Sequence, residues 1–130
     1  MIRNVYANYP QIKFVGGCFG EQIIAETLGG KVEKMPLDPV REKCLGREWV
    51  KPTDEFFEQD FVKKYMAEHH LAKDTLPRII LQESHGDHVV RLPEGATLLA
   101  YSDSCNVEVY SIKNRVLCFQ SHPDYNCGLQ

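Results

Sequence analysis

The chain has 130 residues, of which 43% are hydrophobic and 25% charged, and its formal net charge is −3 at pH 7. This is the composition of one ordinary globular domain, and the lack of a basic cluster argues against nucleic acid as a principal partner. We expect no membrane span and a cytoplasmic location, because no apolar run is long enough to span and the first residues do not form a signal peptide.

The first predicted elements are a strand and a helix joined by a glycine-rich turn. An apolar run predicts a strand over 11–15, and helical spacing predicts a helix over 21–28. Gly29-Gly30 is expected to end this helix, because glycine readily adopts the left-handed conformation of a helix end. Alternation predicts a strand over 31–35, and three prolines with several charges predict a loop over 36–52.

The middle of the chain predicts a second helix. Thr53 precedes two acidic residues, which is typical of a helix N-cap and first turn. Large apolar side chains then recur at helical spacing up to residue 71, and we expect them to face the core or a docked helix. They are Phe57, Phe61, Tyr65 and Met66.

The last part of the chain is rich in β-forming residues. Strands are predicted over 79–82 and 97–101. Two further β-rich runs, 107–112 and 115–119, flank Lys113-Asn114, which is hairpin spacing. We expect Asn114 to take the positive φ of the tight turn. With the strand-turn-helix start, this order predicts one mixed α/β sheet.

The most informative motif is a cysteine between glycines, Gly16-Gly17-Cys18-Phe19-Gly20, placed between the first strand and the first helix. This is the pattern of a nucleophile elbow, the sharp turn that presents a reactive side chain at a sheet edge. We expect Gly16 and Gly20 to be required, because backbone segments in such a turn approach too closely for a Cβ. The helix start favours a thiolate. The alternative is that Cys18 is a small buried hydrophobic residue.

Three residues with reactive side chains follow predicted strands. Cys18 follows the first strand, His85 follows the strand over 79–82, and His122 follows the second hairpin strand. Because the ends of strands in an α/β sheet meet at one edge, we expect the three to share a site. His122 is the candidate general base for Cys18.

The other cysteines and histidines indicate neither disulfides nor a metal site. The five cysteines are odd in number and widely spaced, with no C-x-x-C, which favours a reducing compartment. His85 and His88 are three residues apart but lack a set of further metal ligands nearby. We therefore expect no metal, and we assign no reactive role to Cys44, Cys105, Cys118 and Cys127.

Several motifs, taken together and in order, resemble the class I glutamine amidotransferases. Gly16 to Gln22 resembles the G-x-C-x-G-x-Q elbow of that family, and Gln120 to Asp124 resembles its Q-x-H-P-E. Ser84-His85-Gly86-Asp87, followed by Leu92 to Ala96, resembles S-H-G-D and L-P-x-G-A. The resemblance covers nearly the whole chain and is closest to the γ-glutamyl peptidase-like branch.

The resemblance implies a fold and a reaction. The fold is a flavodoxin-like, three-layer α/β domain with a mixed, mostly parallel sheet. The reaction is hydrolysis of a γ-glutamyl amide bond of glutamine or a γ-glutamyl small molecule through a thioester on cysteine. A γ-glutamyl peptidase is favoured over a glutaminase that feeds ammonia to a synthase, because no synthase domain is expected in this chain.

The resemblance also assigns roles to residues. Cys18 becomes the nucleophile, His122 the base and Asp124 the third member of the triad, where the family usually has glutamate. Phe19 would donate an oxyanion-hole N–H, and the γ-glutamyl group would be held by Gln22, Ser84 and His85. Glu21 stands at a position that varies in the family, and we assign it no role.

The family has roughly another half-domain before the elbow, within ordinary domain sizes. We therefore expect residues 1–130 to be a partial class I glutamine amidotransferase-like domain that lacks the first strands and the second oxyanion-hole loop. A second polypeptide would complete it. The alternative function is an inactive amidotransferase-like domain that serves as a structural or interaction subunit of a larger assembly.

Overall fold

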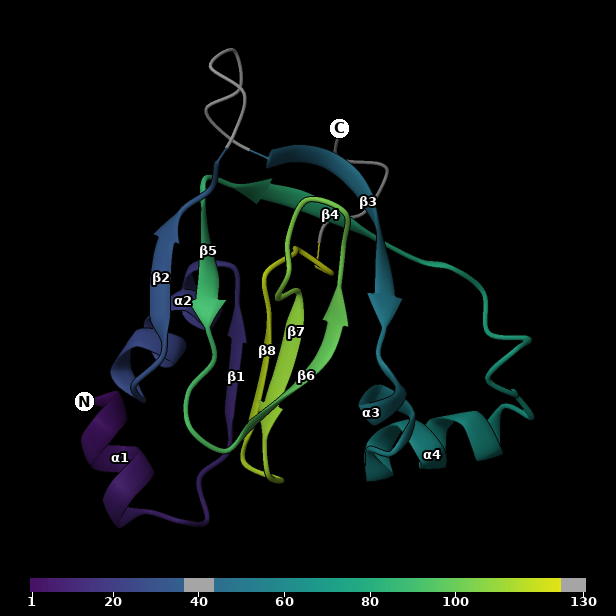
Figure 1. Ribbon diagram of the computed structural model, residues 1–130. Helices are drawn as coiled ribbons and strands as arrows, with labels where there is room; N and C mark the ends of the chain where they lie inside the picture. The colour runs from purple at the N-terminus through teal and green to yellow at the C-terminus, as the bar shows by residue number, and fades with distance from the viewer. Residues whose placement is uncertain (37–43, 125–130) are drawn as a thin grey trace.

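A six-stranded mixed sheet and a two-stranded ribbon organise the chain (Figure 1). The computed structural model describes residues 1–36 and 44–124. Its elements are α1 (Ile2–Asn8), β1 (Phe14–Gly17), α2 (Phe19–Thr27), β2 (Lys31–Lys34), β3 (Cys44–Pro52), α3 (Asp54–Phe57), α4 (Asp60–Glu68), β4 (Ile79–His85), β5 (Asp87–Arg91), β6 (Ala96–Tyr101), β7 (Val109–Ile112) and β8 (Val116–Phe119).

The six strands lie in the order β1-β8-β7-β6-β3-β4, and β2 pairs with β5 in the separate ribbon. The prediction of a mixed α/β sheet is confirmed. Between the described strands, β1 and β8 are parallel and the other pairings are antiparallel, so the expected predominance of parallel strands is wrong for this part of the chain. The long β3–β4 pair arches over the rest of the sheet (Figure 1).

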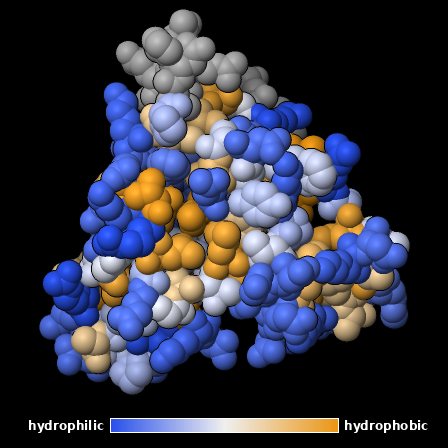
Figure 2. All heavy atoms as spheres, viewed as in Figure 1, coloured by the Kyte–Doolittle hydropathy of each residue, from blue (hydrophilic) through white to orange (hydrophobic). Residues whose placement is uncertain are grey.

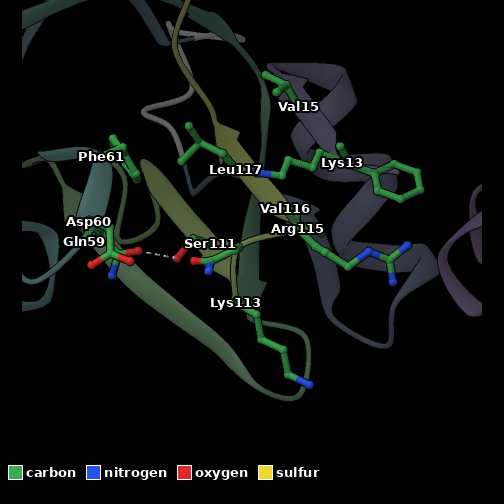
Figure 3. A pocket seen from close by; sticks show the side chains of 12 residues that line it. Lys13, Val15, Gln59, Asp60, Phe61, Ser111, Lys113, Arg115, Val116 and Leu117 are labelled. Carbon is green, nitrogen blue, oxygen red and sulfur yellow. Dashed lines mark hydrogen bonds between the residues drawn. The ribbon is translucent and has the colours of Figure 1, made fainter. Parts of the chain in front are cut away.

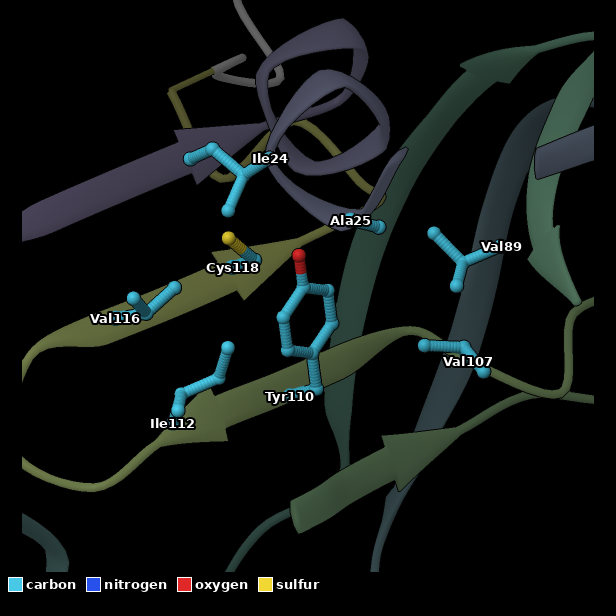
Figure 4. Close-up of a cluster of buried hydrophobic side chains, with 8 residues drawn as sticks. All are labelled: Ile24, Ala25, Val89, Val107, Tyr110, Ile112, Val116 and Cys118. Atoms are coloured by element: carbon cyan, nitrogen blue, oxygen red, sulfur yellow. The ribbon is translucent and has the colours of Figure 1, made fainter. Parts of the chain in front are cut away.

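The main core lies between α2 and the face of β7 and β8 (Figure 4). Tyr110 and Ile112 on β7, and Val116 and Cys118 on β8, alternate along their strands, so all four side chains point to the same face. Ile24 and the neighbouring Ala25 cover them from α2. The predicted helix is confirmed, and Gly29, with φ of +95°, follows its end as expected.

Residues 44–52 form a strand, so the predicted loop over 36–52 is wrong there, and 37–43 lie outside the described residues. β3 is held by its antiparallel pairing with β4, from Cys44 opposite His85 to Val50 opposite Ile79. Backbone hydrogen bonding to a strand that is distant in the sequence overrides the local prolines and charges. The prolines fall at or beyond the ends of the strand, where ladder hydrogen bonds are not required.

Two local predictions are wrong in detail. The β7–β8 connection has three residues, 113–115, and Lys113 takes the positive φ of 49° that was expected of Asn114. Thr53 is the N-cap of α3 as predicted, but its hydroxyl donates to the Leu98 carbonyl oxygen at 2.9 Å and makes no cap hydrogen bond. That hydroxyl fastens α3 to β6.

Two of the apolar side chains expected to face the core or a docked helix lie largely at the surface. α4 buries Val62, whereas Phe61 is 50% and Tyr65 55% exposed. Apolar side chains also reach the surface in the middle of the face seen in Figure 2, surrounded by polar residues. Among the described helices, none is long and apolar enough to cross a membrane.

Arg115 ties the segment between α1 and β1 to the β7–β8 turn. Its guanidinium donates to the carbonyl oxygens of Tyr6 at 2.7 Å, Tyr9 at 2.9 Å and Ile12 at 3.1 Å. A lysine ammonium lacks the planar fork that reaches three separate acceptors. We expect Arg115→Lys to lower the free energy of unfolding by about 1–2 kcal/mol in urea denaturation. An unchanged midpoint would contradict this role.

Candidate functional site

Cys18 lies at a strained turn between β1 and α2. It is the N-cap residue of α2, with φ of 51° and ψ of −111°. A positive φ is unusual for a residue with a Cβ and is typical of functional sites held by the surrounding structure. The Cys18 N–H donates to the Phe119 carbonyl oxygen at 2.9 Å, and the Gln22 N–H donates to the Cys18 carbonyl oxygen at 3.3 Å. The elbow is therefore fixed by β8 on one side and by α2 on the other.

Gly16 and Gly20 of the elbow differ in the space available for a Cβ. A Cβ on Gly16 would lie 2.8 Å from the backbone carbon and oxygen of Gly20 and from a methyl group of Ile24. A Cβ on Gly20 would meet nothing within 4 Å. The close approach expected of the elbow is thus real at Gly16, whereas the expectation that Gly20 must lack a Cβ is wrong.

The surroundings of the Cys18 thiol favour its protonated form by raising its pKa. Its sulfur donates to the Ser84 carbonyl oxygen at 3.8 Å. Burial raises the pKa of Cys18, the backbone N–H of Phe19 lowers it, and the carboxylates of Glu21, Glu83 and Asp124 raise it further. The backbone N–H of Phe19 therefore partly offsets the effect of burial on the thiol.

His122 and Cys18 both contact strand β4. The His122 N–H donates to the Gln82 carbonyl oxygen at 2.8 Å in an isolated antiparallel bridge. The carbonyls of residues 82 and 84 are two residues apart, so they point to the same edge of β4, roughly 7 Å from each other. Cys18 and His122 therefore contact backbone carbonyl groups on the same edge of β4.

Asp124 lies beside the imidazole at the surface. Its Oδ1 is 3.7 Å from His122 Nδ1, and its side chain is 74% exposed, whereas that of His122 is 19% exposed. This separation is an ion-pair contact and is longer than a hydrogen bond. The remaining residues of the C-terminal motif, including Tyr125 and Asn126, lie outside the described residues, as does Cys127.

His85 and Gln22 are engaged inside the protein. His85 Nδ1 is 2.9 Å from the Asp87 carbonyl oxygen, and Nε2 is 3.0 Å from Glu83 Oε2. Gln22 Nε2 donates to the Asp87 carbonyl oxygen and to Gln120 Oε1, both at 3.0 Å. These side chains connect the elbow helix to the turn after β4, and Ser84 offers the carbonyl group beside the sulfur.

Sequence reasoning missed a group of buried acids behind the elbow. Glu21, Glu83 and Glu108 are each 0% exposed. Glu21 had been assigned no role, although it is the fourth residue of the elbow counted from Cys18. The sequence does contain a signal for their burial, because each of the three has the spacing of the residues that face the core.

The cavity drawn in Figure 3 lies away from this site. It has a volume of about 400 Å³ and opens on the sheet face opposite α2, beside Val15, Phe61 and Leu117. None of Cys18, His85 and His122 lines it. In the described part of the chain no cluster of three or more potential metal ligands occurs, and the four described cysteines are free thiols.

Comparisons with known proteins agree with the observed fold. A family model described as glutamine amidotransferase class-I matches residues 1–130. γ-Glutamyl peptidase 4 of Arabidopsis thaliana is 40% identical over 115 residues, which are 88% of this chain and 41% of that protein. A glutamine-hydrolysing GMP synthase of Ectopseudomonas mendocina is 35% identical over 118 residues, or 87% of this chain and 20% of that protein.

Solved structures share the fold at low sequence identity. A glutamine amido transferase from Methylobacillus flagellatus aligns with a TM-score of 0.72 and 22% identity, covering 98% of this chain and 44% of that one. A glutamine amidotransferase from Thermotoga maritima aligns with a TM-score of 0.66 and 21% identity, covering 93% and 44%. The chain spans about two fifths of the length of the γ-glutamyl peptidases that it matches.

Proposed function

The chain belongs to the class-I glutamine amidotransferase family, and from this premise we propose that it hydrolyses γ-glutamyl amide bonds with Cys18, His122 and Asp124. The observation that carries the proposal is the shared edge of β4, where the Cys18 thiol meets the Ser84 carbonyl and the His122 backbone meets that of Gln82. γ-Glutamyl peptidases among the relatives favour a γ-glutamyl peptide over free glutamine as the substrate.

In the proposed reaction His122 removes the thiol proton of Cys18, and the sulfur attacks the γ-carbonyl carbon of the substrate. A C–S bond forms, the C–N bond breaks, and the departing amine takes the proton from the imidazolium. Water then hydrolyses the thioester to glutamate and the free thiol. Asp124 orients the imidazole, and the Phe19 N–H faces the developing oxyanion.

The proposed substrate-holding residues act through the backbone that they position. Gln22 and His85 use their polar atoms on Asp87, Gln120 and Glu83. They would therefore hold the elbow helix and the end of β4 in place while the γ-glutamyl group lies along the Ser84 segment. The reaction needs no metal and no organic cofactor, and four free cysteines are consistent with a reducing compartment.

We also propose that a second polypeptide completes this domain. Among the described strands β1 pairs with β8 alone, so its other edge is unpaired. Val15 on this strand is 70% exposed, beside the cavity of Figure 3. An unpaired strand edge is also compatible with the alternative function, a structural subunit whose elbow is inactive. The raised pKa of the Cys18 thiol favours this alternative, because it disfavours the nucleophilic thiolate.

Covalent labelling of Cys18 separates the two functions. We expect a glutamine-analogue diazoketone to modify Cys18 stoichiometrically in the complete native assembly, and glutamate to be released from a γ-glutamyl peptide. Cys18→Ala should abolish both, whereas Cys44→Ser should keep both, because serine retains the hydrogen bonds to Ser104 and Glu48. Absence of label on Cys18, with normal assembly of Cys18→Ala, would favour the structural subunit.

A further inference from the structure

Three carboxyl groups are enclosed behind the elbow. Glu21 is in the first turn of α2, Glu83 is on β4 next to Ser84, and Glu108 directly precedes β7. All three residues are 0% exposed. Carboxylates are almost never fully buried unless they are paired, so this group requires an explanation.

Most of these carboxyl oxygens have no hydrogen-bond partner among residues 1–36 and 44–124. They are both oxygens of Glu21, Oε1 of Glu83 and Oε2 of Glu108. The remaining two oxygens contact His85 Nε2 at 3.0 Å and the Ser102 hydroxyl at 2.6 Å. Within the described ranges the ion pairs of these glutamates are limited to that of Glu83 with His85.

One histidine cannot balance three negative charges. If all three glutamates were ionised and His85 protonated, two buried negative charges would remain without compensation, which is a prohibitive arrangement. The directions of the pKa shifts agree with this count. Burial and the neighbouring carboxylates raise the pKa of Glu21 well above its ordinary value and that of Glu108 to about 7. Burial also raises the pKa of Glu83, against the opposing effect of His85.

We propose that Glu21, Glu83 and Glu108 form a proton-holding cluster, and that ionisation of this cluster suppresses the reactivity of Cys18 at alkaline pH. Glu21 follows Cys18 by three residues, and Glu83 adjoins Ser84, whose carbonyl oxygen accepts the hydrogen bond from the thiol. The cluster is therefore in electrostatic contact with the sulfur from both α2 and β4.

The direction of the effect follows from charge alone. When the cluster holds its protons, it does not oppose a thiolate on Cys18. As the pH rises and protons leave the cluster, the new negative charges raise the pKa of the thiol, so the thiolate fraction grows more slowly than it would beside neutral groups. The other titratable groups facing the three carboxyls are Cys44, Glu48, His85, Cys105, Tyr110, Cys118 and His122.

The test is the pH dependence of Cys18 alkylation by iodoacetamide, followed by mass spectrometry of the Cys18 peptide. It measures thiol reactivity and is independent of whether the chain hydrolyses any amide. In Glu21→Gln/Glu108→Gln the neutral amides imitate protonated carboxyls and fill the same space. We expect this variant to react about tenfold faster than the wild type at pH 9 and equally within about twofold at pH 6.

The matched control is Glu55→Gln/Glu94→Gln, which makes the same two chemical replacements at exposed carboxylates. Its alkylation profile should follow that of the wild type. Identical profiles for the buried variant and the wild type would overturn the proposal. Carbon-13 NMR of the wild-type glutamate carboxyls gives a second measurement, in which Glu108 should titrate with a pKa of about 7 and the pKa of Glu21 should lie well above that of an ordinary glutamate. Titration of all three near pH 4 would also overturn it.

Discussion

His122→Gln is expected to lower kcat for release of glutamate by roughly 100- to 10,000-fold, because it removes the proposed general base. Glutamine retains the backbone N–H, so the hydrogen bond to the Gln82 carbonyl oxygen should persist. The variant should therefore fold normally and still be alkylated at Cys18. Steady-state kinetics with a γ-glutamyl peptide, run on the complete native assembly, measures the effect.

Asp124→Asn and His88→Gln show whether that loss is specific. Asp124 is 3.7 Å from His122 Nδ1 and largely exposed, so we expect its replacement to cost about tenfold or less. His88 lies on β5 and has no role in the proposed reaction, so His88→Gln should retain wild-type kcat. Equal losses in His122→Gln and His88→Gln, or none in either, would contradict the assignment of His122.

The strand ends that carry the site could be predicted because their signals are local. Cys18 lies between glycines after an apolar run, and His122 follows the second strand of the predicted hairpin. Glycine spacing and apolar runs predict the structure of the few residues around them. The rule that strand ends share an edge led to the prediction that Cys18, His85 and His122 share a site, but it did not identify the contacts of Cys18 and His122 with β4.

The long β3–β4 pair could not be predicted, because its stability comes from pairing between distant segments. Residues 44–52 carry charges and end in a proline, and much of this strand is exposed. Its backbone hydrogen bonds to β4 are non-local and leave no pattern in the segment itself. The turn residue Lys113 was missed for a related reason, since the registers of β7 and β8 decide which residue takes the positive φ.

The periodicity of the sequence predicts that these glutamates are buried, whereas their residue type predicts that they are exposed. Glu21 has helical spacing with Ile24, Ala25 and Leu28, which pack in or against the core. Glu83 alternates with Leu81 and His85, and Glu108 is two residues before Tyr110. Charged residues are ordinarily assigned to the surface. At a functional site the position in the pattern is the better guide, because such sites depart from local rules.

Gly16→Ala is expected to lower the free energy of unfolding by about 3 kcal/mol, the upper part of the usual range for overpacking. The new Cβ would lie 2.8 Å from two backbone atoms of Gly20 and from Ile24 Cδ1. The Ile24 methyl could rotate away, but the Gly20 backbone belongs to the first turn of α2 and cannot move without moving the elbow. Urea denaturation measures the loss, and the same displacement should slow alkylation of Cys18.

Gly20→Ala is the matched control, and its expected effect has the opposite sign. The added Cβ at position 20 meets nothing within 4 Å, and the residue lies inside α2 without a positive φ. Alanine in a helix is more stable than glycine by roughly 0.5–1 kcal/mol, so this variant should unfold at a higher urea concentration than the wild type. Equal destabilisation by the two substitutions would mean that the motif needs both glycines. Opposite signs would mean that the elbow depends on the close approach at Gly16 alone.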